Sequence, residues 1–226
     1  MTLQTHQSTP SLNPYPLLST LALADVAYLT ARYLLDAYSE PQRHYHTLEH
    51  IQSMLSLLPD VQSYLNDEEE TIVQLAIWFH DCVYDPRAKV HGDNERRSVE
   101  KWVEFAEKME PPQPEIQKRV STLIGATISH QLPSPKDPLC ALFLDLDLSI
   151  LASPPQIYDM YAKNIREEYS NFNDKQYRQG RIEILEKFLE KEQIFMSEVV
   201  RGREGQARGN IGREIERLRA GIGKAG

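Results

Sequence analysis

The chain has 226 residues, of which 41% are hydrophobic and 26% are charged, enough for one large or two small domains with a real core. The net charge of −8 argues against a general nucleic-acid binder, which usually presents a basic face, so we expect no nucleic-acid partner. A small anionic substrate is still compatible with this charge, because a bound metal inverts the charge of a site locally.

Glycine and cysteine usage bear on the fold class and the compartment. Seven of the 10 glycines follow residue 201, and the nearly glycine-free body of the chain favours helices over a turn-dense sheet. The two cysteines, Cys82 and Cys140, form no CxxC motif and fit buried thiols in a reducing cytosol. No signal-peptide pattern and no run near the ~18 apolar residues of a membrane span occurs. We expect an all-α, cytoplasmic protein that is not bound to a membrane.

The first half of the chain predicts a leader and four helices. Residues 1–14 are polar with two prolines and read as a flexible leader. Asn66 is a predicted N-cap because acids fill the turn after it, and the apolar helix that ends at Phe79 is expected to be central. Proline at position 59 is expected to stop the second helix. The four helices are predicted over residues 17–38, 47–58, 66–79 and 94–108.

The second half predicts four more elements. A helix after Pro114 has the stripe Ile116, Val120, Leu123, Thr127 and His130, whose steps of three and four residues place these side chains on one face. Further helices are expected to begin at Pro138 and Pro154 and to run from Asn173 to Lys191. The Gly/Arg-rich residues 201–226 are predicted to be a frayed tail, with a short helix around Ile211, Ile215 and Leu218 as the alternative.

The candidate chemistry begins with the histidines. Six of the seven lie between His44 and His130, and imidazole is a nitrogen ligand that works near neutral pH. His80 and Asp81 end the most apolar helix, where a carboxylate needs a partner such as a metal ion, a salt bridge or a helix end. His46 stands four residues before His50 and shares its face if one helix includes both.

Two aspartates, Asp145 and Asp147, lie downstream inside another apolar helical run. Charge in such a place is costly without a partner. Because the two residues are two apart, they point to different faces of a helix and are not expected to bind one ion together.

Five segments carry a resemblance to a known family. They read RHYHTLEHI from Arg43, FHDCVYD from Phe79, DNERRS from Asp93, IGATISH from Ile124 and DLDLSIL from Asp145. This combination resembles the HD superfamily of metal-dependent phosphohydrolases, and within it a bacterial branch, over about residues 40–170. The resemblance implies an all-α HD-domain helical bundle, which we expect as a single domain over residues 15–200, between the 1–14 leader and the 201–226 tail.

The resemblance also implies a ligand set for a divalent metal ion. Carried over by position, His50, His80 and Asp81 match the first three ligands of the family. The last aspartate of HD proteins often stands second in a D-x-D motif, which favours Asp147 over Asp145 as the fourth. Nitrogen and carboxylate ligands without a thiolate suit Mn, Fe, Co, Ni, Zn or Mg.

Three residues are candidates for proton transfer. Glu95 and Asp85 follow the His–Asp pair closely enough to act as proton-transfer or supporting groups, and the alternative is an exposed acid. His130 is a candidate to donate a hydrogen bond to the substrate or to protonate its leaving oxygen, and the alternative is a core histidine.

Three other residues are candidates for substrate contact. Arg43 could pair with a substrate phosphate, unless it is a surface arginine. His46 is a candidate site residue, against a packed or capping histidine. Thr127 stands where the apolar stripe of its helix turns polar, which often marks a cavity.

The expected function is hydrolysis of a small phosphate ester, such as a nucleotide, by a metal-activated water. One alternative is a two-iron oxygenase on the same fold, with His130, His91 and His46 as possible extra ligands. The other is a non-catalytic module that binds only metal or ligand, because fold alone does not fix function.

Overall fold

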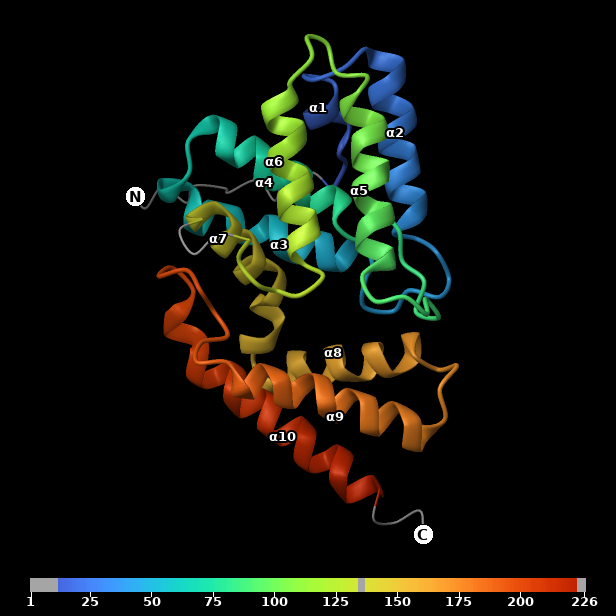
Figure 1. Ribbon diagram of the computed structural model, residues 1–226, viewed down its shortest axis with the longest axis vertical. Helices are drawn as coiled ribbons and strands as arrows, with labels where there is room; N and C mark the ends of the chain where they lie inside the picture. Colours follow the sequence, from blue (N-terminus) through green and yellow to red (C-terminus); the bar gives the residue numbers. More distant parts are fainter. Residues whose placement is uncertain (1–11, 134–136, 223–226) are drawn as a thin grey trace, which may run out of the picture.

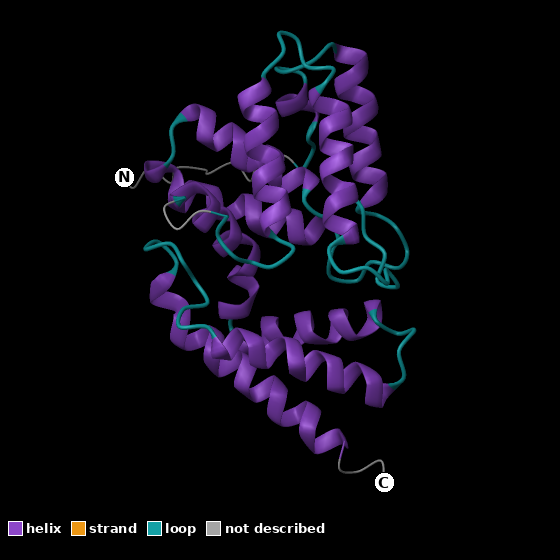
Figure 2. Ribbon diagram, viewed as in Figure 1, coloured by secondary structure: helices purple, strands orange, loops and turns teal. Residues whose placement is uncertain are grey.

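The computed structural model describes residues 12–133 and 137–222. Over these ranges every regular element is a helix (Figure 2), so the all-α prediction is confirmed. The α-helices are α1 (Tyr15–Leu18), α2 (Ala24–Ala37), α3 (Leu48–Val61), α4 (Asp67–Phe79), α5 (Asp93–Ala106), α6 (Pro114–Ala126), α7 (Pro138–Asp147), α8 (Pro155–Glu168), α9 (Asp174–Glu190) and α10 (Glu204–Ile222). Three short 3-10 helices join them: η1 (Gln62–Tyr64), η2 (Leu148–Ala152) and η3 (Arg201–Arg203).

The helices form two hydrophobic clusters. The first is built from α1 to α7 and ends at Leu146, and the second begins at Leu148 and takes in α8, α9 and α10. In Figure 1 the first cluster fills the upper part of the molecule, and α8 to α10 lie below it. Asp147 therefore stands in the chain where one core stops and the other starts. Both cysteines are buried and free, Cys82 in the first cluster beside α4 and Cys140 in α7.

Side-chain caps explain where two of the predicted helices begin. Asn66 accepts from the backbone of Glu69 at 3.0 Å and Glu69 reaches back to the N–H of Asn66 at 3.0 Å, which makes a capping box before α4. Asn173 and Gln176 form the same arrangement before α9. The helix α3 continues past the predicted stop at Pro59 and ends two residues later, at Val61. Proline has no N–H to donate to the carbonyl four residues back, which weakens the helix at this point.

The helix predicted over residues 17–38 is broken into α1 and α2, which corrects that prediction. The hydroxyl of Thr20 donates to Leu17 O at 2.7 Å, and such local bonds compete with a continuing helix. The carbonyl of Leu21 accepts from Glu110 N at 2.9 Å. The turn after α1 is therefore held by a distant part of the chain, a partner that local sequence does not reveal.

The frayed tail expected over residues 201–226 is not what the structure shows over 201–222. Residues 204–222 form a 19-residue helix, α10, that packs on α8, α9 and η2. Ile211 is fully buried and Ile215 nearly so, and both belong to the second cluster. Burial of this apolar face stabilises a helix whose glycines disfavour it locally. The leader prediction falls largely on residues 1–11, and the end of the tail prediction on 223–226, both outside the described residues.

Asp145 fastens the chain between α9 and α10 onto α7. Its carboxylate is fully buried and accepts from the backbone N–H groups of Met196, at 2.9 Å, and Ser197, at 2.6 Å. Hydrogen bonds from amides to a buried carboxylate are among the stronger ones in proteins. This clasp ties the second cluster to the helix that carries Asp147.

Within the described residues, no single helix is long and apolar enough to cross a membrane. The bent pair Pro138–Ala152 and Pro155–Glu168, with 102° between its halves, has the length and composition of a span.

The clasp predicts a specific loss of stability. Asp145→Ala leaves two buried N–H groups without their acceptor, and we expect the free energy of unfolding to fall by about 3 kcal/mol, measured by urea denaturation. Asp159→Ala is the matched control, because Asp159 pairs with Arg217 at the surface and such pairs contribute only about 0–1 kcal/mol. An Asp145→Ala protein as stable as the control would contradict the clasp.

Candidate functional site

Four polar side chains from three helices meet between the two clusters. His50 lies in the first turn of α3, which begins at the cap Thr47. His80 is the C-cap residue of α4, directly after Phe79, and Asp81 follows it, while Asp147 ends α7. The two histidines are buried at 3% and 1% exposure. Residues far apart in the sequence are thus brought to one point by the ends of packed helices.

The nitrogen and oxygen atoms of His50, His80 and Asp147 lie at the spacing of groups around one ion, and Asp81 lies beside the two imidazoles. His50 Nε2 is 3.2 Å from His80 Nε2 and 3.3 Å from Asp147 Oδ1. His80 Nε2 is 3.7 Å from Asp147 Oδ1 and 3.1 Å from Asp81 Oδ2, which is 3.9 Å from His50 Nε2. Two ligands that each bind one ion at about 2.1 Å, at tetrahedral or octahedral angles, are roughly 3.0–3.4 Å apart. His50, His80 and Asp147 could therefore hold a metal ion.

The hydrogen bonds behind the imidazoles suit this role. His80 Nδ1 lies 2.9 Å from the carbonyl of Ile77. A carbonyl only accepts, so Nδ1 carries a proton, and Nε2 is the nitrogen that faces the cluster and can bind a metal. His50 Nδ1 is buried and has no hydrogen-bond partner in the described part of the chain. His50 is therefore held by packing alone on that side.

The electrostatics of the cluster favour a positive charge. Burial lowers the pKa of His80, but the carboxylates of Asp81 and Asp147 raise it more, to about 9. Burial raises the pKa of Asp81, but the neighbouring imidazoles, His80 first, lower it more, so this carboxyl stays ionised. The pKa of His50 is lowered, chiefly by burial, which keeps this ring neutral and able to bind a metal. Two carboxylates beside two imidazole nitrogens suit a divalent cation, which would take the place of the proton on His80.

Asp145 and Asp147 have separate partners, as expected for residues two apart on a helix. The carboxylate of Asp147 faces His50 and His80 with one oxygen, and its other oxygen lies 3.1 Å from His130 Nε2. Asp145 is occupied by the backbone of Met196 and Ser197. Of the two alternatives for the last ligand, the geometry brings Asp147 to the cluster.

A cavity of about 170 Å³ adjoins the cluster. Its polar lining comes from both sides of the junction between the two clusters and consists of His46, Asp81, Glu95, Thr127, His130, Asp147 and Arg181. The remaining wall is apolar or aromatic and includes Tyr45, Tyr161, Leu185 and Phe188. Six residues that the sequence predicts for the site line this cavity: His46, Asp81, Glu95, Thr127, His130 and Asp147.

His130 reaches the cavity through an unusual backbone conformation. The helix α6 ends at Ala126, and His130 has φ 47°, in the left-handed region. Its N–H donates to Ala126 O at 3.0 Å, and its carbonyl accepts from Lys191 Nζ at 2.9 Å. The turn aims the imidazole back at Asp147. Thr127 lies at the end of the same helix, and its hydroxyl donates to Ile124 O at 2.7 Å.

His46 is fixed by a buried carboxylate that the sequence did not reveal. Glu168, at the end of α8, lies 2.7 Å from His46 Nδ1 and accepts from the backbone N–H groups of His44, Tyr45 and His46 at 2.7–2.9 Å. Tyr84 donates its hydroxyl to the same carboxylate at 2.8 Å. Because a carboxylate accepts, Nδ1 of His46 carries the proton, and Nε2 lies 4.0 Å from Asp81 Oδ2. His46 precedes α3, so it shares no helix with His50.

Two predicted site residues lie elsewhere. The side chain of Arg43 is fully buried, and its guanidinium donates to the carbonyls of His46 at 3.0 Å and Asp81 at 2.8 Å. Arg43 therefore supports the backbone beneath the site, whereas the sequence predicted that it would contact a substrate phosphate. Asp85 is exposed, accepts from Arg87 N at 2.9 Å, and does not line the cavity, contrary to the predicted proton-transfer role. His91, an alternative ligand, is also exposed.

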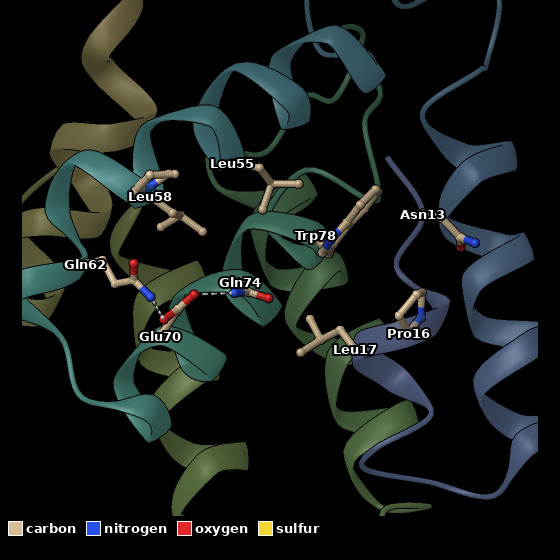
Figure 3. Close-up of a pocket in the computed structure, with 10 residues that line it drawn as sticks. Asn13, Pro16, Leu17, Leu55, Leu58, Gln62, Glu70, Gln74 and Trp78 are labelled. Atoms are coloured by element: carbon tan, nitrogen blue, oxygen red, sulfur yellow. Dashed lines mark hydrogen bonds between the residues drawn. The ribbon is translucent and has the colours of Figure 1, made fainter. Parts of the chain in front are cut away.

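A second cavity, between α1, α3 and α4, lacks comparable chemistry. It measures about 340 Å³ and is drawn in Figure 3. Its charged residue, Glu70, accepts from Gln62 at 3.3 Å and Gln74 at 3.0 Å, and Leu17 and Trp78 supply apolar walls. This pocket holds no cluster of metal-binding groups among the described residues. The junction cavity is therefore the candidate site.

The comparisons with known proteins add no family assignment. No protein-family model matches this sequence, and no curated protein matches it significantly. The resemblance to the HD superfamily rests on the five sequence segments described above.

Metal binding predicts a gain in thermal stability. Mn²⁺ at about 100 times its Kd is expected to raise the Tm of the protein by roughly 5–10 °C, because an ion that binds only the folded state stabilises it. Asp147→Ala removes a ligand and should abolish most of the shift in differential scanning fluorimetry. Asp145→Asn, two residues away, should start at a lower Tm but keep the shift. Equal shifts in both variants would show that Asp147 does not bind the ion.

The Glu168 network predicts a stability that depends on pH. Burial raises the pKa of Glu168, but its bonds to His46 and to the backbone lower it more, to about 2, from an ordinary 4.5. Stabilisation by the ionised group is thus complete above pH 4.5 and is lost as the pH falls toward 2. We expect Glu168→Gln to lower the free energy of unfolding by roughly 2–3 kcal/mol at pH 7 and by clearly less at pH 3.

Urea denaturation at the two pH values measures this difference. Tyr84→Phe, which removes one of the donors to Glu168, is the control and should cost about 1 kcal/mol. A Glu168→Gln penalty that is the same at both pH values would refute the assignment of the charge to this carboxyl.

Proposed function

We propose that this protein is a metal-dependent phosphohydrolase of the HD type that acts on a small phosphate ester. The observation that carries the proposal is that His50 Nε2, His80 Nε2 and Asp147 Oδ1 lie 3.2–3.7 Å from one another. Asp81 Oδ2 lies 3.1 Å from His80 Nε2 and 3.9 Å from His50 Nε2. These are the positions that the HD resemblance nominates as ligands. The tight grouping supports one shared cation, bound by all four residues.

A divalent ion bound here would lower the pKa of a bound water molecule and polarise a phosphoryl oxygen of the substrate. The residues of the chain provide the rest. His130 is held against Asp147 at 3.1 Å with its imidazole at the cavity, where it can donate a proton to the leaving oxygen. Glu95 lines the same cavity from the first turn of α5 and can accept a proton. His46 is oriented by Glu168 and faces the cavity with Nε2.

The dimensions of the cavity favour a small substrate. About 170 Å³ is less than the roughly 300–1,000 Å³ of pockets that enclose drug-sized ligands. The apolar and aromatic wall suits the organic group of an ester, and the polar side suits its phosphate. At a net charge of −8, a bound metal and Arg181 in the cavity wall would attract an anionic substrate.

A two-iron oxygenase is the second candidate. The observation that favours it is that two further imidazoles adjoin the cluster: His130 Nε2 at 3.1 Å from Asp147 and His46 Nε2 at 4.0 Å from Asp81. Both nitrogens face carboxylates that could bridge two ions. Metal counted per chain separates the candidates, because one ion with phosphate release supports hydrolysis and two irons support oxidation. Bound metal without turnover of any ester would support a non-catalytic module.

Variants of Asp81 and His130 test the proposed roles. Asp81→Ala is expected to lose most bound metal and all turnover, since one of four ligands is gone. His130→Ala should keep near-normal metal but lower the release of phosphate about 100-fold, within the usual range for a general acid. Both are measured with a panel of small phosphate monoesters, beside metal analysis of the same samples.

Asp93→Asn is the matched control, because Asp93 begins α5 near the site but does not line the cavity. A folded Asp81→Ala protein with normal metal and turnover would refute the proposal. Loss of metal in His130→Ala would make His130 a ligand and support the two-iron candidate.

A further inference from the structure

Within the described residues, one cationic side chain of the Lys/Arg type lines the candidate cavity. It is Arg181, in α9, and Leu185 and Phe188 follow it on the same helical face. This face lines the cavity from the side of the second cluster, and the ring of Phe188 lies 6.1 Å from that of His130. The metal ligands all come from the first cluster or its boundary, so the wall that contains Arg181 is a separate one.

The guanidinium of Arg181 is rigidly held. Its Nε donates to Glu214 Oε1 at 2.9 Å, and its Nη2 donates to Glu214 Oε2 at 3.3 Å and to the hydroxyl of Tyr161 at 3.1 Å. Tyr158 in turn donates to Glu214 at 2.6 Å. The side chains of Arg181 and Glu214 are only 9% and 5% exposed. This bracing fixes one arginine geometry before any ligand arrives, which reduces the entropic cost of binding.

One part of the guanidinium is not used by this bracing. Nη1 forms no hydrogen bond with any residue that the structure describes, while Nε and Nη2 are both engaged. The free N–H groups belong to a side chain that lines the cavity. A buried, charged donor facing a cavity is a strong site for an oxyanion, because charge-assisted bonds in a low dielectric exceed neutral ones.

We propose that Arg181 binds an oxyanion of the substrate through Nη1, as an anchor separate from the metal ligands. This inference rests on the proposed function and deepens it, because it specifies an ester whose anionic oxygens reach the α9 wall. The oxyanion is the phosphate itself or a second acidic group of the same molecule. Arg181 is then a binding residue, and Glu214 is the carboxylate that compensates its charge before a ligand binds.

A structural role alone makes a different prediction from this one. If Arg181 only joins α9 to α10, removing either partner of the pair should affect ligand binding in the same direction. If Arg181 binds the anion, Arg181→Gln loses the donor, whereas Glu214→Gln keeps the cation and frees more of its N–H groups. The double variant Arg181→Gln/Glu214→Gln avoids a buried unpaired charge and keeps the bond from Tyr158, so it protects the fold.

Calorimetry on the Mn²⁺-loaded protein tests the inference with two probes. Inorganic phosphate offers one oxyanion. Phosphonoacetate offers a phosphonate and a carboxylate, and its P–C bond is not hydrolysed. We expect the double variant to bind phosphonoacetate roughly ten- to a hundredfold more weakly than the wild type, and Glu214→Gln to bind it as tightly or more tightly. Weakened binding of both probes assigns Arg181 to the phosphate, and weakened binding of phosphonoacetate alone assigns it to the second group.

Arg178→Gln is the matched control on α9, because Arg178 pairs with Asp174 outside the cavity, and it should leave both affinities unchanged. Metal content and Tm are measured on every variant. If a folded, metal-loaded double variant binds both probes with wild-type affinity, the role of Arg181 is overturned and the proposed function is not. The same follows if Glu214→Gln weakens probe binding as much as the double variant does. A wild-type protein that holds metal but binds neither probe overturns the proposed function and this inference with it.

Discussion

Two imidazole nitrogens, Nε2 of His50 and Nε2 of His80, face each other at 3.2 Å in the interior, with the carboxylates of Asp81 and Asp147 beside them. Such a group of buried titratable atoms is costly unless a cation or protons compensate it. The surrounding structure has to hold it together from three helices at once. The capping of α4, the ending of α7 at Asp147 and the brace of Arg43 beneath the loops all serve that convergence.

The same structure uses buried carboxylates as fasteners between distant segments. Asp145 holds the backbone at Met196 and Ser197, and Glu168 gathers the backbone N–H groups that precede α3. Glu204 likewise accepts from the N–H groups of Ile194 and Phe195 at 3.1 Å. Each of these acids satisfies amides in irregular chain, where no helix supplies the partner. Asp145 and Glu168 join segments of the first cluster to segments of the second, and the cavity lies along that junction.

Local signals made part of this arrangement predictable. Asn66 and Asn173 each stand three residues before a Glu or Gln, the spacing of a capping box. Together with hydrophobic periodicity, this spacing predicts the ends of α4 and α9 to within about two residues. His80 and Asp81 are conspicuous because charge ends an apolar run. Asp145 and Asp147 are two residues apart on a helix, so their side chains point to different faces and are not expected to bind the same ion.

The parts of the fold and of the site that the sequence did not predict depend on partners that are remote in sequence. Glu168 reads as one acid in a charged helix, and its partners lie more than 80 residues away. Arg181 reads as a surface arginine, since nothing near it predicts that Glu214 and Tyr161 will enclose it. The glycines of α10 predict fraying, yet burial of its apolar face outweighs that propensity. Arg43 illustrates the reverse error, because an arginine beside a motif resembles a ligand contact until its carbonyl partners are known.

His130 sets two demands on one position. Its backbone, at φ 47°, is of the kind that glycine adopts freely and that costs other residues roughly 1 kcal/mol or more. Its imidazole, however, is the group that meets Asp147. A glycine here would relax the turn but leave Asp147 without this neighbour, so folding and chemistry favour different residues at the same place. Selection for thermostability alone would therefore be expected to replace His130 before other residues of the site. At this one turn, a more stable backbone and the group that meets Asp147 require different residues.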